Sequence, residues 1–101
     1  MRILVLLDPT NKRGTKGAYT ALRSFLQSDG YIRIGNELFM RITFNRKTAE
    51  KHLSRLREHN PGTGIVRVIR MTEKQYDNIW YLTGESDRQE NVVGKNSHIS
   101  L

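Results

Sequence analysis

A single carboxylate and a group of cations lie close together near the start of the sequence. Asp8 follows the aliphatic run 2–7 and is the only acidic residue in the first 28 positions. The stretch 11–17 that follows is polar, contains two glycines and carries Lys12, Arg13 and Lys16. Guanidinium and ammonium groups bind phosphate oxygens. The sequence therefore predicts a phosphodiester-binding loop beside an acidic residue.

The role of Asp8 has two interpretations. A carboxylate at a strand end is a candidate catalytic residue and Mg²⁺ ligand, but magnesium usually requires more than one anionic ligand. A two-fold axis would supply a second Asp8 from another copy of the chain. Alternatively, Asp8 only begins a turn, because Asp-Pro-Thr is a common turn composition.

The net charge points to a polyanionic partner. The 101 residues include 17 Lys and Arg against 10 Asp and Glu, a net charge of +7, and the positive excess lies in residues 1–83. Each phosphate that a protein neutralises releases condensed counterions, so such a balance favours nucleic acid. The alternative is a charge that serves only solubility. Arg41 joins the loop cations as a candidate nucleic-acid ligand.

Several other classes of site are disfavoured. The absence of cysteine excludes disulfides, thiolate zinc sites and cysteine nucleophiles. His52, His59 and His98 have neither metal-ligand spacing nor a serine arrangement typical of a triad. Aromatic residues could stack on bases in an open-sheet RNA-binding protein, but in strands they more often belong to a core or a dimer interface. They are Tyr19, Tyr31, Phe39, Tyr76, Trp80 and Tyr81.

The order of elements predicts an α+β fold. A chain this short forms one domain. Apolar spacing predicts helices beginning near Ala18 and after Asn45, and β-prone stretches surround them. The order βαββαβ is the ferredoxin-like plan, in which two helices cover one face of an antiparallel sheet and the other face stays open. The predicted strands are 2–7, 31–34, 38–44 and 64–71.

The C-terminal part extends this plan. Residues 72–76 predict a capped helical turn, and residues 79–83 predict a short additional strand that could pair with a partner's sheet. The ferredoxin-like domain is therefore assigned to 1–84, and the polar tail 85–101 is expected to be mobile. The longest apolar run is too short to cross a bilayer, and the N-terminus lacks a signal-peptide pattern. A cytoplasmic protein without membrane contact is expected.

The ordered set of motifs resembles the Cas-two family of CRISPR adaptation proteins. The likeness runs from the aliphatic strand ending in Asp8 through 25–31 and Leu38-Phe39, and it is strongest at 55–61, 72–76 and 80–84. It implies a homodimer with facing sheets, the additional strand reaching to the neighbour and the two Asp8 side chains near the two-fold axis. It also implies a CRISPR integrase subunit and duplex DNA as partners, with possible Mg²⁺-dependent cleavage of single-stranded RNA or duplex DNA.

Three functions follow as hypotheses. The first is a DNA-binding scaffold for spacer acquisition that bridges integrase dimers and performs no essential chemistry. The second is a magnesium-dependent endonuclease that uses paired Asp8 carboxylates. The third is a toxin-like RNA-cleaving ferredoxin fold that acts without an integrase. Replacement of Asp8 discriminates the first two.

Overall fold

The computed structural model describes residues 1–11 and 13–84. Lys12, one of the predicted phosphate ligands, and the tail 85–101 lie outside the described residues. The chain divides into two compact units, Met1–Met71 and Thr72–Leu101. Each unit is treated by itself.

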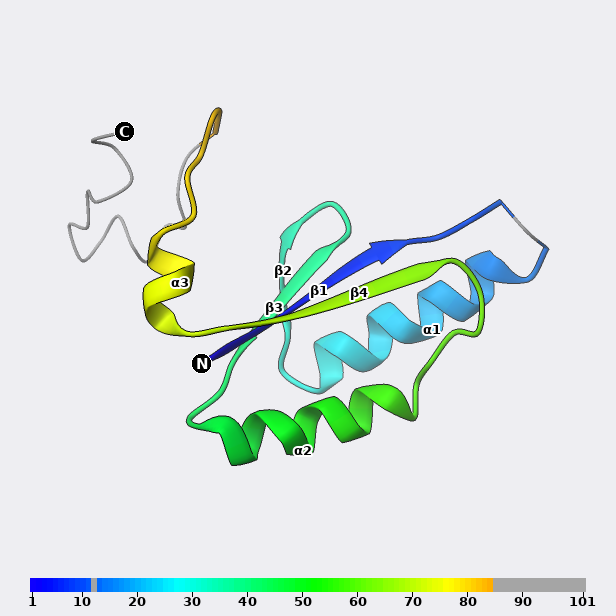
Figure 1. Ribbon diagram of the computed structural model, residues 1–101. Coiled ribbons are helices and arrows are strands. Elements are labelled where there is room, and N and C mark those ends of the chain that lie inside the picture. The colour runs from blue at the N-terminus through cyan, green and yellow to red at the C-terminus, as the bar shows by residue number, and fades with distance from the viewer. Residues whose placement is uncertain (12, 85–101) are drawn as a thin grey trace. The chain divides into compact units, whose positions relative to one another are not determined.

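The first unit contains the βαββαβ order expected from the sequence, and the second begins with a short helix (Figure 1). The elements are β1 (Arg2–Asp8), α1 (Thr15–Ser28), β2 (Ile32–Gly35), β3 (Leu38–Ile42), α2 (Arg46–Arg57), β4 (Ile65–Met71) and α3 (Glu73–Asp77).

The four strands form one antiparallel sheet in the order β2-β3-β1-β4. β1 therefore lies in the interior of the sheet, as its run of apolar residues on both faces predicts. α1 and α2 lie on the same side of the sheet (Figure 1). This α+β architecture is compatible with the ferredoxin-like fold.

The face beneath the helices is a closed apolar core. Ile3, Val5 and Leu7 alternate along β1 and are buried, and Phe39 of β3 is paired with Val5 in the register. Alternate residues of a strand point to the same face, so these side chains meet the apolar sides of α1 and α2. The buried cluster also includes Tyr19, Leu22, Leu26, Tyr31, Ala49 and Leu56.

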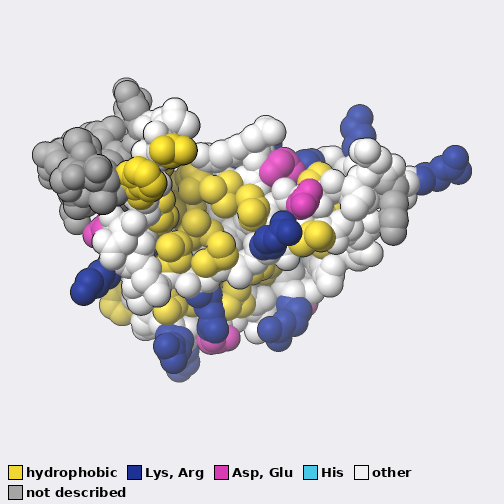
Figure 2. Space-filling view, turned by 45° about the horizontal axis from the view of Figure 1, so that its top comes forward, with side chains coloured by type: hydrophobic (Ala, Val, Ile, Leu, Met, Phe, Trp, Pro, Cys, Tyr) yellow, Lys and Arg dark blue, Asp and Glu magenta, His cyan; other side chains and the backbone are white. Residues whose placement is uncertain are grey.

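The opposite face is apolar and has neither α1 nor α2 over it. Its register positions carry Leu4, Leu6 and Met40 in the middle of the sheet, where Leu4 and Met40 are buried. Figure 2 shows hydrophobic side chains gathered over the strands. Four isoleucines there remain about half exposed: Ile32 (51%), Ile42 (53%), Ile65 (49%) and Ile69 (46%).

Two boundaries differ from the sequence prediction. α1 begins at Thr15, so Lys16 belongs to its first turn instead of the predicted loop 11–17. Gly14 adopts φ +86° as the N-cap, a conformation open to glycine, and this ends the loop earlier than the apolar spacing indicates. The predicted strand 38–44 ends at Ile42, and Phe44 is 92% exposed. By contrast, Asn45 caps α2 as predicted and accepts a hydrogen bond from the Thr48 amide.

In the second unit, the predicted capped turn is confirmed. The Thr72 side chain accepts from the Gln75 amide, and the Gln75 side chain accepts from the Thr72 amide, which together make a capping box. The additional strand predicted at 79–83 is wrong for the single chain, because residues 79–84 form no strand. A strand needs a neighbouring strand for its hydrogen bonds, and propensity alone does not provide one.

No helix in the described part of the chain has both the length and the apolarity needed to span a membrane.

Candidate nucleic-acid interface

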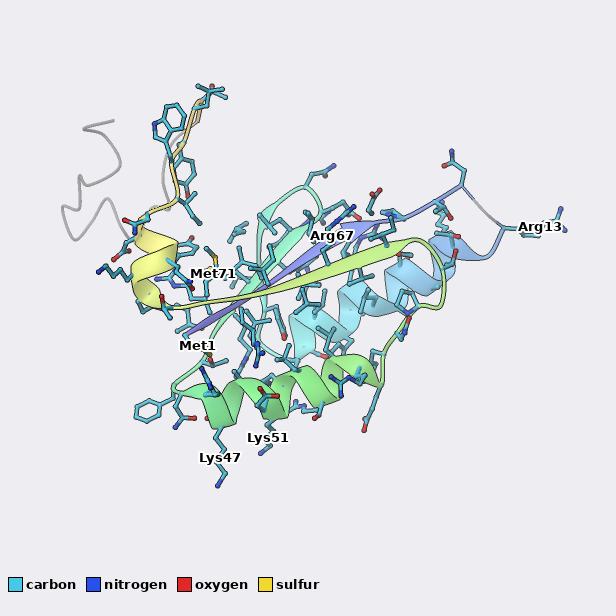
Figure 3. The ribbon with its side chains drawn as sticks, in the orientation of Figure 1. Met1, Arg13, Lys47, Lys51, Arg67 and Met71 are labelled. Atoms are coloured by element: carbon cyan, nitrogen blue, oxygen red, sulfur yellow. The ribbon has the colours of Figure 1, made fainter. Side chains whose placement is uncertain are left out.

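Asp8 lies on the open face at the end of β1. Its backbone is paired with Ile65 of β4, and its Oδ2 lies 3.6 Å from a guanidinium nitrogen of Arg67 (Figure 3). Both side chains are more than half exposed, at 59% and 52%. An ion pair this open to water is weak, typically worth less than about 1 kcal/mol. Asp8 is therefore accessible but already has a cationic neighbour.

The backbone around Asp8 is held by close packing at Gly64. Gly64 has φ +69°, and a Cβ atom there would lie 2.8 Å from the Asp8 carbonyl oxygen and would collide with the Tyr19 hydroxyl. That hydroxyl donates a 2.6 Å hydrogen bond to the Thr63 carbonyl oxygen. These contacts fix the end of β1 against the segment that precedes β4, so the position of the Asp8 backbone is set by the fold.

The described residues of one copy do not provide a magnesium site. No group of three or more His, Cys, Asp and Glu side chains in residues 1–11 and 13–84 is placed to share a metal ion. The ion-pair neighbour of Asp8 in this part of the chain is the cation Arg67, whereas magnesium is usually held by more than one anionic group. A site at Asp8 therefore requires ligands beyond the described residues of one copy, such as a second copy or bound phosphate.

Two of the predicted loop cations lie at the start of α1. Arg13 precedes the Gly14 N-cap and points outward (Figure 3), and Lys16 lies in the first turn. α1 has no side-chain cap and no acid in its first turn. The first amides of a helix carry partial positive charge, and cations there add to it instead of compensating it. This end of α1 is strongly attractive to anions.

Most of the described cations of the first unit fall into two groups. The paired group contacts acids: Arg23 and Arg33 contact Glu37, Arg55 contacts Asp29, Arg67 contacts Asp8 and Arg70 contacts Glu50. The second group has no ion-pair or hydrogen-bond partner for its side chains among the described residues. It consists of Arg13, Lys16, Arg46, Lys47, Lys51 and Arg57.

Arg41 lies elsewhere, on the helix-covered face. Its Nε donates a 3.1 Å hydrogen bond to His52 Nε2, and its terminal NH1 donates to the Asp29 carbonyl oxygen. Gly30 has φ +90°, and the space that a Cβ atom there would occupy is filled by the Arg41 guanidinium. A phosphate contact by Arg41, as the sequence predicts, would require this guanidinium to leave both partners.

The contact with Arg41 also sets the tautomer of a neutral His52 ring. Because His52 Nε2 accepts from Arg41, the proton of a neutral ring lies on Nδ1, which is 3.1 Å from Asp29 Oδ2. Asp29 Oδ1 accepts from Arg55. The Asp29 side chain is only 2% exposed, so these partners compensate a buried carboxylate. The cluster joins the end of α1 to β3 and α2.

Tyr31 lies beside this cluster with its hydroxyl buried. The Tyr31 Oη has no hydrogen-bond partner within the described part of the chain. Burial, followed by the charge of Asp29, raises the pKa of Tyr31 to about 12 against the opposing effect of Arg41 and Arg55. The phenol therefore stays neutral far into the alkaline range.

Tyr19, Tyr31 and Phe39 do not form a base-stacking platform on the sheet. All three are buried in the helix-side core. The paired positions of the open face carry no aromatic residue, so the interpretation of these three residues as core is confirmed.

A groove of about 670 Å³ lies between α2 and β4 on the helix side of the sheet. Leu53, Leu56, Val66 and Val68 line its apolar part. Asp8, Arg13 and Lys16 are not among its lining residues. The groove is therefore separate from the predicted interface.

Sequence reasoning missed two contacts. Arg67 received no role from the sequence, but antiparallel pairing of Asp8 with Ile65 places Arg67 diagonally across from Asp8 on the same face. Asp29 and His52 received no role, and their meeting depends on how α1 packs beside α2. The first contact follows from strand register, and a register prediction would have found it. The second has no local sequence signal.

Comparison with known proteins supplies the family. No protein-family profile matches the chain. Curated relatives nevertheless align over most of it, each named CRISPR-associated endoribonuclease Cas2. The relative from Acidovorax ebreus is 39% identical over 94 residues, which cover 92% of each chain. The relative from Streptococcus mutans serotype c (strain ATCC 700610 / UA159) is 33% identical over 88 residues, covering 86% of this chain and 81% of its own.

A more distant relative extends the same pattern. The protein from Ligilactobacillus salivarius is 29% identical over 90 residues, covering 88% of this chain and 89% of its own. The resemblance inferred from the motifs is confirmed, and the chain belongs to the Cas2 family of CRISPR-associated proteins.

Proposed function

We propose that the protein binds the backbone of duplex DNA as the small homodimeric subunit of a CRISPR spacer-acquisition complex, where it bridges integrase dimers. The observation that carries the DNA-binding part is the unpaired cations at the start of α1. Arg13 and Lys16 have no acidic partner among the described residues, although seven other arginines of the first unit are engaged by protein groups. Phosphate would satisfy both cations and the uncapped amides of α1.

The uncovered face of the sheet supports the homodimer. Large exposed apolar patches on small proteins mark interaction sites. Packing two such faces together would remove the half-exposed isoleucines from water. It would also bring the two β1 strands, each ending in Asp8, to one interface. Residues 79–83, which are β-prone but form no strand in the single chain, would then be available to the neighbour's sheet.

A salt titration of duplex binding tests the DNA-binding proposal. Fluorescence anisotropy of a labelled blunt DNA duplex would be measured for the wild type, for Arg13→Gln/Lys16→Gln and for Arg23→Gln. The slope of log K against log salt is negative, and each lost phosphate contact makes it shallower by about 0.9. The slope of the double variant should therefore be shallower than that of the wild type by about 2. Arg23 contacts Glu37 at 2.9 Å, and its loss should leave the slope unchanged.

Equal slopes for the wild type and the double variant would overturn this assignment. Bridging is tested separately, by co-expression and co-purification with a CRISPR integrase subunit. Retention of the integrase at a fixed ratio supports an acquisition complex. Its absence would leave the third hypothesis, an RNA-cleaving protein that acts alone.

Endonuclease activity is the second candidate function, and the name shared by the relatives favours it. Two Asp8 carboxylates at a dimer interface would be needed to hold Mg²⁺, which when bound lowers the pKa of a coordinated water. Labelled duplex DNA and single-stranded RNA would be incubated with and without Mg²⁺, using the wild type and Asp8→Asn. Cleavage that requires both the metal and Asp8 establishes the nuclease. Equal binding without cleavage by either protein leaves the scaffold.

A further inference from the structure

The N-terminal end of α2 combines three features that the fold of a single copy does not explain. Phe44, the residue before the Asn45 N-cap, is 92% exposed. Arg46 and Lys47 occupy the first two helical positions, and α2 has no acid in its first turn. Lys51 follows one turn after Lys47, and both point away from the sheet (Figure 3). An aromatic ring and three cations thus lie together at one helix end.

Each feature is unfavourable for the isolated chain. A hydrophobic residue before an N-cap often packs on the fourth helical residue, here Ala49. Ala49 is fully buried while Phe44 is almost fully exposed, so Phe44 gains little from such a contact. Cations in the first turn are repelled by the positive N-terminal end of the helix dipole. Arg46, Lys47 and Lys51 have no partner among the described residues to compensate them.

α3 shows the opposite arrangement in the same chain. Its N-cap is Thr72, and its first turn begins with Glu73, an acid that suits the helix dipole. Asn45 of α2 is an equally good cap, so the start of α2 is locally well formed. The two helix starts therefore differ in the charge of the first turn and in the exposed ring of Phe44. A ligand for the start of α2 would need negative charge and a flat apolar surface.

We infer that Phe44 with Arg46, Lys47 and Lys51 forms a second nucleic-acid contact, which binds a single strand by stacking an unpaired base on Phe44. Proteins that bind single strands combine cations along the backbone with aromatic rings on which bases stack. A duplex hides the faces of its bases, so the ring contributes only when bases are unpaired. This inference rests on the proposed nucleic-acid function and adds a ligand class and a site on a different helix from Arg13 and Lys16.

Binding of single strands by Phe44 variants tests the inference. Anisotropy would be measured with labelled dT15, labelled rU15 and a blunt DNA duplex for the wild type, Phe44→Leu and Phe44→Trp. Loss of one stacked base weakens binding about 5- to 150-fold. Phe44→Leu keeps an apolar side chain without a ring, so it should weaken binding of the single strands by at least about 5-fold. Phe44→Trp should restore it, and the duplex should be unaffected by either change.

The cations are tested by the salt dependence of dT15 binding. Lys47→Gln/Lys51→Gln should make the negative slope of log K against log salt shallower by about 1.4, because each phosphate contact to a single strand contributes about 0.7. Arg70→Gln is the matched control, since Arg70 contacts Glu50 and its loss should leave the slope unchanged. The dT15 and rU15 measurements distinguish DNA from RNA as the source of the strand.

Several results would overturn the inference while leaving duplex binding intact. They are a wild type that binds neither single strand, a Phe44→Leu variant that binds both as the wild type does, and equal losses on single strands and duplex. Light scattering after size exclusion adds a fourth: a change in oligomeric state on Phe44→Leu would make Phe44 a protein contact. Conversely, single-strand binding without duplex binding would reject the proposed function and retain the inference.

Discussion

The two faces of the sheet differ in how completely the single chain buries their apolar side chains and pairs their charged groups. On the helix-covered face, apolar side chains are buried, and the buried carboxylate of Asp29 has His52 and Arg55 as partners. On the open face, isoleucines remain half exposed, and Asp8 meets Arg67 in water. The covered face therefore determines the stability of the single copy. The open face is the one on which we propose that this protein meets a second copy.

The largest expected effect is on the covered face. Phe39→Ala removes a fully buried ring at the centre of the core and should lower the free energy of unfolding by about 3–5 kcal/mol. Ile69→Ala on the open face should cost less than about 1 kcal/mol, because Ile69 is half exposed. Urea titration followed by circular dichroism measures both. Similar losses would mean that the faces are equally important to the fold.

The next effect concerns association through the open face. Ile69→Asp places a charge in the proposed dimer interface and should raise the dimer dissociation constant at least 100-fold, a change of about 3 kcal/mol. The circular dichroism spectrum of the folded chain should remain unchanged. Analytical ultracentrifugation over a range of concentrations measures the dissociation constant. A dimer that forms as tightly as in the wild type would place the interface elsewhere.

Two arginine–aspartate pairs provide a smaller, matched comparison. Arg55→Gln removes a charge from Asp29, whose side chain is buried, and should cost about 1–2 kcal/mol of unfolding free energy. Arg67→Gln removes the same charge from the exposed Asp8 and should cost less than about 0.5 kcal/mol. Urea titrations at neutral pH compare the two variants. A larger loss for Arg67→Gln would show that the open face supports the fold of the single copy.

The smallest effect is a pH dependence that belongs only to the covered face. The pKa of Tyr31 is about 12 in the folded protein, against about 10 for an unfolded tyrosine. The folded state therefore keeps the Tyr31 proton to higher pH. The stabilisation is complete below pH 10 and is lost as the pH rises through 12, by about 1.4 kcal/mol per unit at most.

Tyr31→Phe is the control for this dependence. It removes a buried hydroxyl without a partner, so it should be neutral or slightly stabilising at pH 8. Urea titrations of both proteins at pH 8, 10 and 11 isolate the contribution of Tyr31, because other groups titrate alike in both. Parallel curves for the wild type and the variant would contradict the raised pKa.

Local sequence signals predicted most of the first unit. Apolar runs, helical apolar spacing and the residue Asn45 identified the strands and helices, because these signals act over a few residues. The strand at 79–83 failed for the opposite reason, since its β-prone residues have no partner strand in the single chain. The start of α1 was placed too late because Gly14 and Gly17 suggested a loop.

For the candidate site, the sequence by itself determined the chemical inventory. It fixed one early carboxylate, a cluster of cations and a positive net charge, because composition and spacing need no fold to be read. Only the tertiary structure decided which cations are available. Arg41 donates to His52 and to the Asp29 carbonyl oxygen on the helix-covered face, and Arg67 lies beside Asp8. Arg13 and Lys16 have no acidic partner among the described residues. The physical reason is that strand register and helix packing join residues far apart in the chain, and charge pairing depends on distances that the sequence does not contain.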